Sequence, residues 1–191
     1  MTLLAFLRTE TRAAHLALED DLGFGPDAIS LTRYEELLAT FLGFHESLEP
    51  ALADSITRHG LPWELLPGAA HLRSDLSGLG WSAERISAMP RSTPPDVSTL
   101  PALIGALYVV EGARLGGQVI TRWVADALGP VPVAFFGGDG DARRRFRRFA
   151  AMAEAALPAT GVPAAGEAAN ACFSAFRAWS GHRDRVQPAG H

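Results

Sequence analysis

Four charged or titratable side chains near the N-terminus have the spacing of one helix face. In chain order they are Arg8, Arg12, His15 and Glu19, at steps of four, three and four residues, so they project from one side over about three turns. A neutral histidine binds a metal through one ring nitrogen, while a carboxylate one turn away accepts a hydrogen bond from the other and orients the ring. This geometry permits a site in which His15 is a metal ligand supported by Glu19, with the two arginines near anionic groups of a bound cofactor, while an ordinary solvated helix face is the alternative.

A glycine-rich segment at mid-chain is the second unusual feature, and it matters because a lone histidine on a helix face is more often an ordinary polar group. Three glycines, Gly112, Gly116 and Gly117, fall within six positions of an otherwise apolar helical pattern. Each glycine in a helix costs about 1 kcal/mol relative to alanine. Either a flat ligand passes close to the bare backbone, or the small residues pack against another helix. The glycine spacing alone slightly favours helix packing.

Apolar residues at three- and four-residue steps predict helices that carry both segments. The second helix is expected to begin at Thr32, which has the capping-box spacing with Glu35, and Pro50 is expected to kink or end it. A proline-rich surface connection at 90–101 and a loop at 131–140 are expected between helices. The expected helices are 3–22, 32 to about 50, 69–78, 82–89, 98–128, 141–157 and 165–180. We expect one domain over 1–185 and a polar tail at 186–191.

Composition favours a soluble cytoplasmic protein. With 191 residues, of which 48% are hydrophobic, the chain is long enough for one well-buried core. Its net charge of −4 disfavours a nucleic-acid partner. Cys172 is the only cysteine, which excludes an intramolecular disulfide and a cysteine-based zinc cluster, and we expect it to be a small buried apolar residue. We expect no export signal, and no membrane span because the apolar run at 103–110 stops at Glu111, well short of roughly 20 residues.

The two segments together resemble the heme oxygenases. The first reads Leu7-Arg8-x2-Thr11-x3-His15-x2-Leu18-Glu19, and the second reads Tyr108-Val109-x-Glu111-Gly112-x2-Leu115-Gly116-Gly117. The second is most similar to the bacterial branch associated with bacteriophytochromes. The resemblance implies an all-α, single-domain, heme oxygenase-like multi-helix fold, with heme between a proximal N-terminal helix and a glycine-rich distal helix.

Position by position, the resemblance also implies roles for individual residues. His15 would be the proximal iron ligand and Glu19 its hydrogen-bonded support. Gly112 and Gly116 would form the distal-helix backbone over the heme, and Gly117 would let that helix flex.

Further residues are expected around the cofactor. Arg8 and Arg12 would approach the heme propionates, and Tyr108 is expected in the cofactor-binding set. A basic run on a late helix, Arg143, Arg144, Arg145, Arg147 and Arg148, is most simply a solvated face. In the family, however, a basic residue on this helix approaches a propionate, and Arg147 is the nearest match. The other arginines would suit an acidic electron donor.

One position departs from the family pattern. Many heme oxygenases have an aspartate directly after the first distal glycine, where it organises water that delivers protons, whereas this sequence has Ala113. Arg114 and Glu111 are the nearest polar residues, but helix phase places them off the glycine face. Of the five remaining histidines, His45, His59, His71 and His182 lie in different segments and offer little, and no Glu-x-x-His pair is present, which argues against a ferritin-like di-iron bundle.

The resemblance implies that heme is both cofactor and substrate and is opened to biliverdin with release of carbon monoxide and ferrous iron. Electrons would come from an external reductant such as a ferredoxin, flavodoxin or reductase, because no dinucleotide-binding fingerprint is present. The product would serve as bilin chromophore, for example for a bacteriophytochrome, or the reaction would serve iron supply. The first alternative is a non-catalytic heme-binding or heme-sensing protein of the same fold, motivated by Ala113. The second is a helical enzyme of the same broad fold that acts on thiamine-like or quinone-precursor substrates.

Overall fold

The computed structural model describes residues 1–138 and 140–186, with side chains through 182, and the regular structure of this part of the chain is entirely helical, with no strand. The elements in order are α1 (Leu3–Leu22), η1 (Pro26–Ala28), α2 (Leu31–His59), α3 (Gly68–Gly78), α4 (Ala83–Ser87), α5 (Leu100–Leu128), α6 (Ala134–Gly137), α7 (Ala142–Ala156), η2 (Ala159–Gly161) and α8 (Val162–Val186). The all-helical prediction is confirmed. Of the polar tail expected at 186–191, Val186 ends α8 and residues 187–191 lie outside the described residues.

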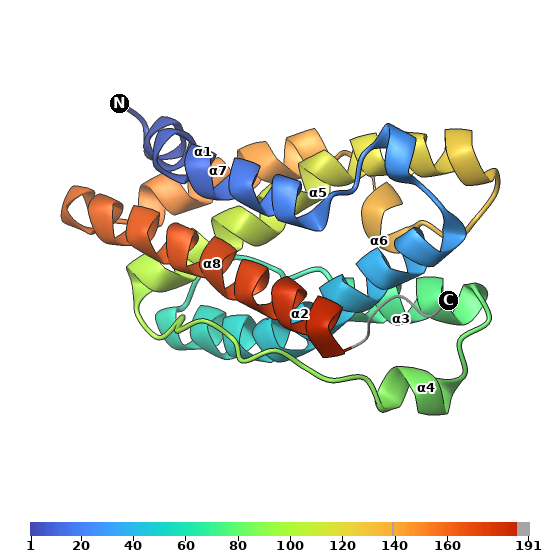
Figure 1. The fold of residues 1–191 in the computed structure, drawn as a ribbon. Helices are drawn as coiled ribbons and strands as arrows, with labels where there is room; N and C mark the ends of the chain where they lie inside the picture. The colour runs from blue at the N-terminus through green and yellow to red at the C-terminus, as the bar shows by residue number, and fades with distance from the viewer. Residues whose placement is uncertain (139, 187–191) are drawn as a thin grey trace.

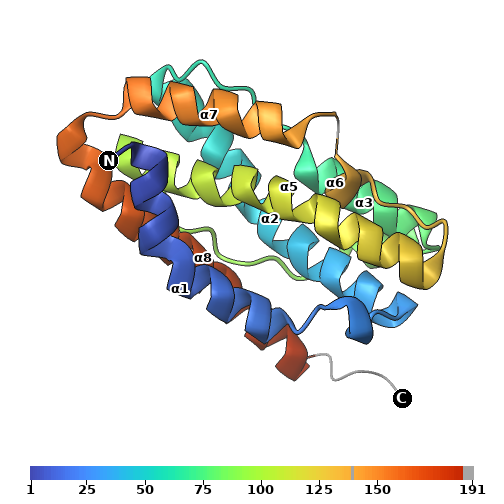
Figure 2. The same ribbon diagram turned by 90° about the horizontal axis from the view of Figure 1, so that it is seen from above.

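The long helix α5 is the central element. It packs against α8, α7, α6 and α2, while α1 packs against α8 and α7. Seen from above, α5 runs between α7 on one side and α1 on the other (Figure 2), and α8 crosses it in the side view (Figure 1). By length and composition alone α5 is long and apolar enough to cross a membrane, but half of its most apolar 18-residue stretch is buried inside the protein. It serves here as the core helix.

Helix α2 differs from its prediction at both ends. Its N-cap is Ser30, whose hydroxyl accepts a hydrogen bond from the amide of Arg33 at 3.2 Å. The capping box expected from Thr32 and Glu35 is therefore wrong, and the Glu35 carboxylate instead accepts a hydrogen bond from Trp81 Nε1 at 3.0 Å. Pro50 does not end the helix, which continues to His59. The turns beyond Pro50 bury apolar side chains such as Leu52 and Ile56, which offsets the backbone hydrogen bond that proline removes.

The loop expected at 131–140 contains the short helix α6. The carboxylate of Asp75, on α3, accepts hydrogen bonds from the amides of Ala134 at 2.7 Å and Phe135 at 2.9 Å. Phe135 and Phe136 are buried in the core. Four residues are too few for a periodic pattern to be recognised, and the group that caps them lies some 59 residues away in the chain. This helix closes one wall of the cavity described next.

Candidate functional site

A cavity of about 840 Å³ lies between α1 and α5, with further walls from α2, α6, α7 and α8. This volume is typical of a site for a cofactor or small organic ligand. Its apolar lining combines leucine, valine and isoleucine side chains with six phenylalanines: Phe41, Phe44, Phe136, Phe146, Phe173 and Phe176. The two segments singled out in the sequence meet here, although about 90 residues separate them in the chain.

Helix α1 presents its polar face to this cavity. Arg8, Arg12, His15 and Glu19 all line it, so the predicted grouping of these four side chains is found in the structure. His15 Nδ1 lies 3.5 Å from Glu19 Oε2, and the His15 side chain is 53% exposed. Its ring also meets Phe173 edge-to-face, with centroids 5.6 Å apart. Because Nδ1 faces the carboxylate, Nε2 is the ring nitrogen available to a ligand in the cavity.

Buried contacts fix the rotation of α1 that brings this face to the cavity. Leu7, Thr11 and Leu18 point into the core. The Thr11 hydroxyl donates to the carbonyl of Leu7 at 2.8 Å and lies 3.5 Å from the hydroxyl of Tyr108, which lines the cavity from α5. The expectation that Tyr108 belongs to this region agrees with its position.

The glycines of α5 divide into two kinds. A Cβ atom placed on Gly112 or Gly116 would meet no atom within 4 Å, and both residues line the cavity. A Cβ on Gly117 would instead lie 2.8 Å from the carbonyl oxygen of Phe136, and one on Gly105 would overlap the carbonyl of Ala165. Helix packing therefore explains Gly105 and Gly117, while Gly112 and Gly116 expose bare backbone to the cavity. Gly117 faces α6 and does not line the cavity.

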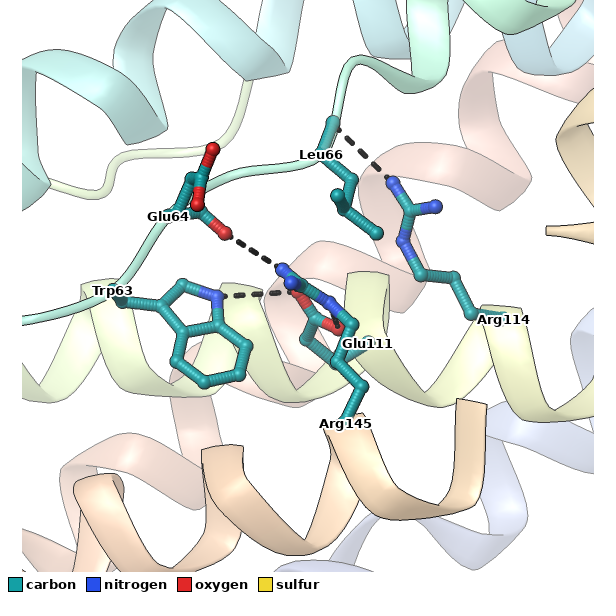
Figure 3. A network of polar contacts seen from close by, with 6 residues as sticks. All are labelled: Trp63, Glu64, Leu66, Glu111, Arg114 and Arg145. Atoms are coloured by element: carbon teal, nitrogen blue, oxygen red, sulfur yellow. Dashed lines mark hydrogen bonds and ion pairs between the residues drawn. The ribbon is translucent and has the colours of Figure 1, made fainter. Parts of the chain in front are cut away.

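The opposite face of α5 carries a polar network, drawn in Figure 3. Glu111 is 1% exposed, and its carboxylate accepts hydrogen bonds from Arg145 Nε and Nη2, both at 2.7 Å, and from Trp63 Nε1 at 3.1 Å. Arg145 also stacks over the Trp63 ring and donates to the carbonyl of Glu64. On the same side of α5, Arg114 Nη2 donates to the carbonyl of Leu66 at 3.3 Å. Glu111 and Arg114 thus lie off the glycine face, as helix phase predicts.

The arginines of the basic run on α7 differ in their surroundings. Arg145 anchors α7 to α5 through Glu111, whereas Arg143, Arg144, Arg147 and Arg148 are exposed. Phe146 reaches the cavity from this helix, but Arg147 does not line it. The proposed contact of Arg147 with a cofactor stays a prediction.

Sequence reasoning missed a second histidine in the cavity wall. His45, on α2, lines the cavity, and its Nδ1 lies 2.9 Å from Glu49 Oε1. The pair has the same four-residue spacing as His15 and Glu19, and this spacing was the signal that could have found it. The burial of His45 among aromatic side chains depends on tertiary packing and has no counterpart in the local sequence.

Comparisons with known proteins agree on one family. A family model described as heme oxygenase matches residues 1–182. A protein named heme oxygenase from Xanthomonas campestris pv. campestris (strain 8004) is 38% identical over 92 residues, a segment that spans 48% of this chain and 48% of that relative. The structure of heme oxygenase from Leptospira interrogans matches with a TM-score of 0.74 and 19% identity, over 95% of this chain and 100% of that one. At 19% identity, this likeness concerns the fold.

Proposed function

The chain belongs to the heme oxygenase family, and on this premise we propose that it opens heme oxidatively to biliverdin, with release of carbon monoxide and ferrous iron. One observation carries the proposal: the imidazole of His15 and the bare backbone of Gly112 and Gly116 line the same cavity. Such a pair of walls suits a flat macrocycle that needs an axial ligand on one face and room for a small molecule on the other.

The residues of the cavity fit heme. Aromatic side chains provide apolar contact for a porphyrin, and the open space over Gly112 and Gly116 is where a Cβ atom would obstruct it. The guanidinium groups of Arg8 and Arg12 line the same cavity and suit the two propionates. When bound, heme supplies the iron at which dioxygen is activated and the meso carbon that is oxidised.

We assign a role to each group of this chain. His15 Nε2 would hold the iron, and Glu19, whose carboxylate lies 3.5 Å from Nδ1, would accept a hydrogen bond from Nδ1–H and orient the ring. The backbone of Gly112 and Gly116 leaves room on the distal face and limits the directions in which a small ligand can lean. The phenylalanines exclude bulk water from the reacting edge.

The proposal extends to partners and location. Electrons come from an external donor such as a ferredoxin, flavodoxin or reductase. The exposed arginines of α7, which are Arg143, Arg144, Arg147 and Arg148, suit an acidic protein of this kind. We further propose a cytoplasmic location and bilin or iron supply as the purpose, with a bacteriophytochrome as one recipient of the product.

A second function, heme binding without turnover, is favoured by one observation. Ala113 lines the cavity at the position where many family members carry a proton-organising aspartate. A protein lacking any replacement for that group would hold heme and leave it intact.

The deciding experiment is an absorption time course of the protein with stoichiometric hemin, before and after addition of reductant in air. Catalase is included to suppress peroxide-driven degradation. Loss of the Soret band with formation of biliverdin, abolished in His15→Ala but not in the control His182→Ala, supports the enzyme. The control histidine is exposed on α8. A stable heme complex would favour the carrier, and failure to bind hemin would refute both heme functions and favour a non-heme enzyme of this fold.

A further inference from the structure

His45 is a buried titratable residue in the cavity wall that has no role in the proposed binding of heme. Its side chain is 5% exposed. The ring stacks on Phe41 with centroids 6.2 Å apart, and Phe135 meets it edge-to-face at 5.0 Å. Phe135 packs on Phe136, whose backbone contacts Gly117 of the glycine segment. His45 thus belongs to the wall that adjoins α6 and the glycine-rich part of α5.

The carboxylate of Glu49 holds the His45 ring at Nδ1. Glu49 Oε1 lies 2.9 Å from His45 Nδ1 and accepts a hydrogen bond from the amide of Ala69, also at 2.9 Å. A Cβ atom on Gly68 would come within 2.7 Å of that carboxylate oxygen and 2.9 Å of Nδ1. Any side chain at Gly68 would therefore displace the pair, so the local backbone is shaped around it.

The pair also spans the wall of the cavity. Glu49, with a side chain that is 16% exposed, lines a second, more open groove of about 530 Å³ on the outside of the protein. Glu46 and Arg91, which form an ion pair at 2.7 Å, line the same groove. His45 therefore faces the inner cavity while its partner carboxylate reaches the solvent side.

The hydrogen bond to Glu49 decides which ring nitrogen serves the cavity. With Nδ1–H donated to the carboxylate, Nε2 is directed to other partners, and no described residue hydrogen-bonds it. A carboxylate in this position fixes the tautomer and the orientation of the ring, so that Nε2 is the nitrogen presented to the cavity.

The other groups packed around His45 include one further carboxylate. From α6 the neighbour is Phe135, and behind it Asp75 of α3 is engaged by the amides of Ala134 and Phe135. Burial raises the pKa of Asp75, and those two amides oppose the shift. The remaining titratable side chains of the cavity are Arg8, Arg12, His15 and Glu19 on α1 and Tyr108 on α5.

We infer that His45, held by Glu49, supplies protons to the distal part of the cavity in place of the aspartate that Ala113 replaces. This inference rests on the proposed function. In the step, the imidazolium Nε2–H gives its proton to a water molecule in the cavity. The ring becomes neutral and keeps Nδ1–H on Glu49, and a proton from solvent then restores the imidazolium ion. Because the donor must be protonated, turnover should fall as the pH rises.

The test compares His45→Gln and Glu49→Gln with the exposed control His182→Gln. In the heme-free protein, histidine resonances followed by NMR against pH should show a His45 signal that is absent from His45→Gln and whose titration curve changes in Glu49→Gln, because the ring loses its hydrogen-bonded partner. In the ferric heme complex, the pH midpoint of the absorption spectrum should shift in both variants while hemin affinity stays at the wild-type level. Single-turnover rates should fall by roughly ten- to a hundredfold in His45→Gln and lose their pH dependence.

The outcomes separate this inference from the proposed function. If the wild type binds and degrades heme while His45→Gln keeps the wild-type rate and pH profile, the role of His45 is refuted and the proposed function stands. A wild type that binds no hemin overturns both. If His45→Gln misfolds, the Glu49→Gln variant decides, since an unchanged His45 titration curve and pH profile would also refute the role.

Discussion

The two cavity-facing glycines of α5 lead to the prediction that substituting them stabilises the heme-free protein. In the variant Gly112→Ala/Gly116→Ala, each new methyl group enters open space, because a Cβ atom at either position has no neighbour within 4 Å. Alanine is favoured over glycine inside a helix by about 1 kcal/mol per site. We therefore expect the double substitution to raise the free energy of unfolding of the heme-free protein by about 2 kcal/mol. For a domain of this size, that corresponds to a rise in Tm of about 4–8 °C.

The same variant should lose affinity for hemin, because the added methyl groups occupy the space through which a flat ligand would approach the backbone. We expect at least a tenfold weaker Kd, equivalent to about 1.4 kcal/mol. The matched control is Gly117→Ala, one position along the same helix. Its Cβ atom would lie 2.8 Å from the carbonyl oxygen of Phe136, so it should destabilise the protein by about 1–3 kcal/mol.

The assays are urea and thermal unfolding of the heme-free proteins, followed by hemin titration. A double variant that is destabilised as much as Gly117→Ala would show that Gly112 and Gly116 pack against other residues. A stabilised variant with unchanged hemin affinity would show that the ligand does not lie over this backbone. Either result would refute the reasoning.

Three further predictions concern the supports of the site. Glu111→Gln should lower the free energy of unfolding by about 3 kcal/mol in urea denaturation, because it breaks a nearly buried ion pair with Arg145. The control Arg147→Ala, at an exposed position, should change that free energy by less than about 0.5 kcal/mol. Equal effects of the two substitutions would contradict this prediction. Asp75→Ala should cost about 3 kcal/mol in the same assay by leaving the two α6 amides without their acceptor, and a loss below 1 kcal/mol would argue against this anchoring role. Burial raises the pKa of the Cys172 thiol from 9.0 to about 12, so a thiol reagent at pH 8 should label only unfolded protein. The free energy of unfolding should decline above about pH 9, because the thiol of the unfolded chain ionises first. Rapid labelling of the native protein would refute this burial.

Local patterns in the sequence were sufficient for the parts of the site that lie on single long helices. The expected helix at 3–22 agrees with α1, and the spacing of His15 and Glu19 placed both on one face. Both inferences need only the helical repeat. Cys172 is buried, as its apolar character predicted.

The features that escaped prediction depend on contacts between distant segments. The short helix α6 exists where Asp75 caps it, and α2 passes through Pro50 because the turns beyond it bury apolar side chains. The different roles of Gly112 and Gly117 also follow from their neighbours in space, since the two look alike in the sequence. His45 escaped attention because its importance comes from lying in the same cavity as His15.

The most direct test of the central claim, that His15 binds heme iron in this cavity, is a resonance Raman spectrum of the ferrous heme complex. We predict an iron–histidine stretching band in the wild type that is absent from His15→Ala and returns when imidazole is added to that variant. Persistence of the band in His15→Ala without imidazole would contradict the account, because another histidine, such as His45, would then be the ligand.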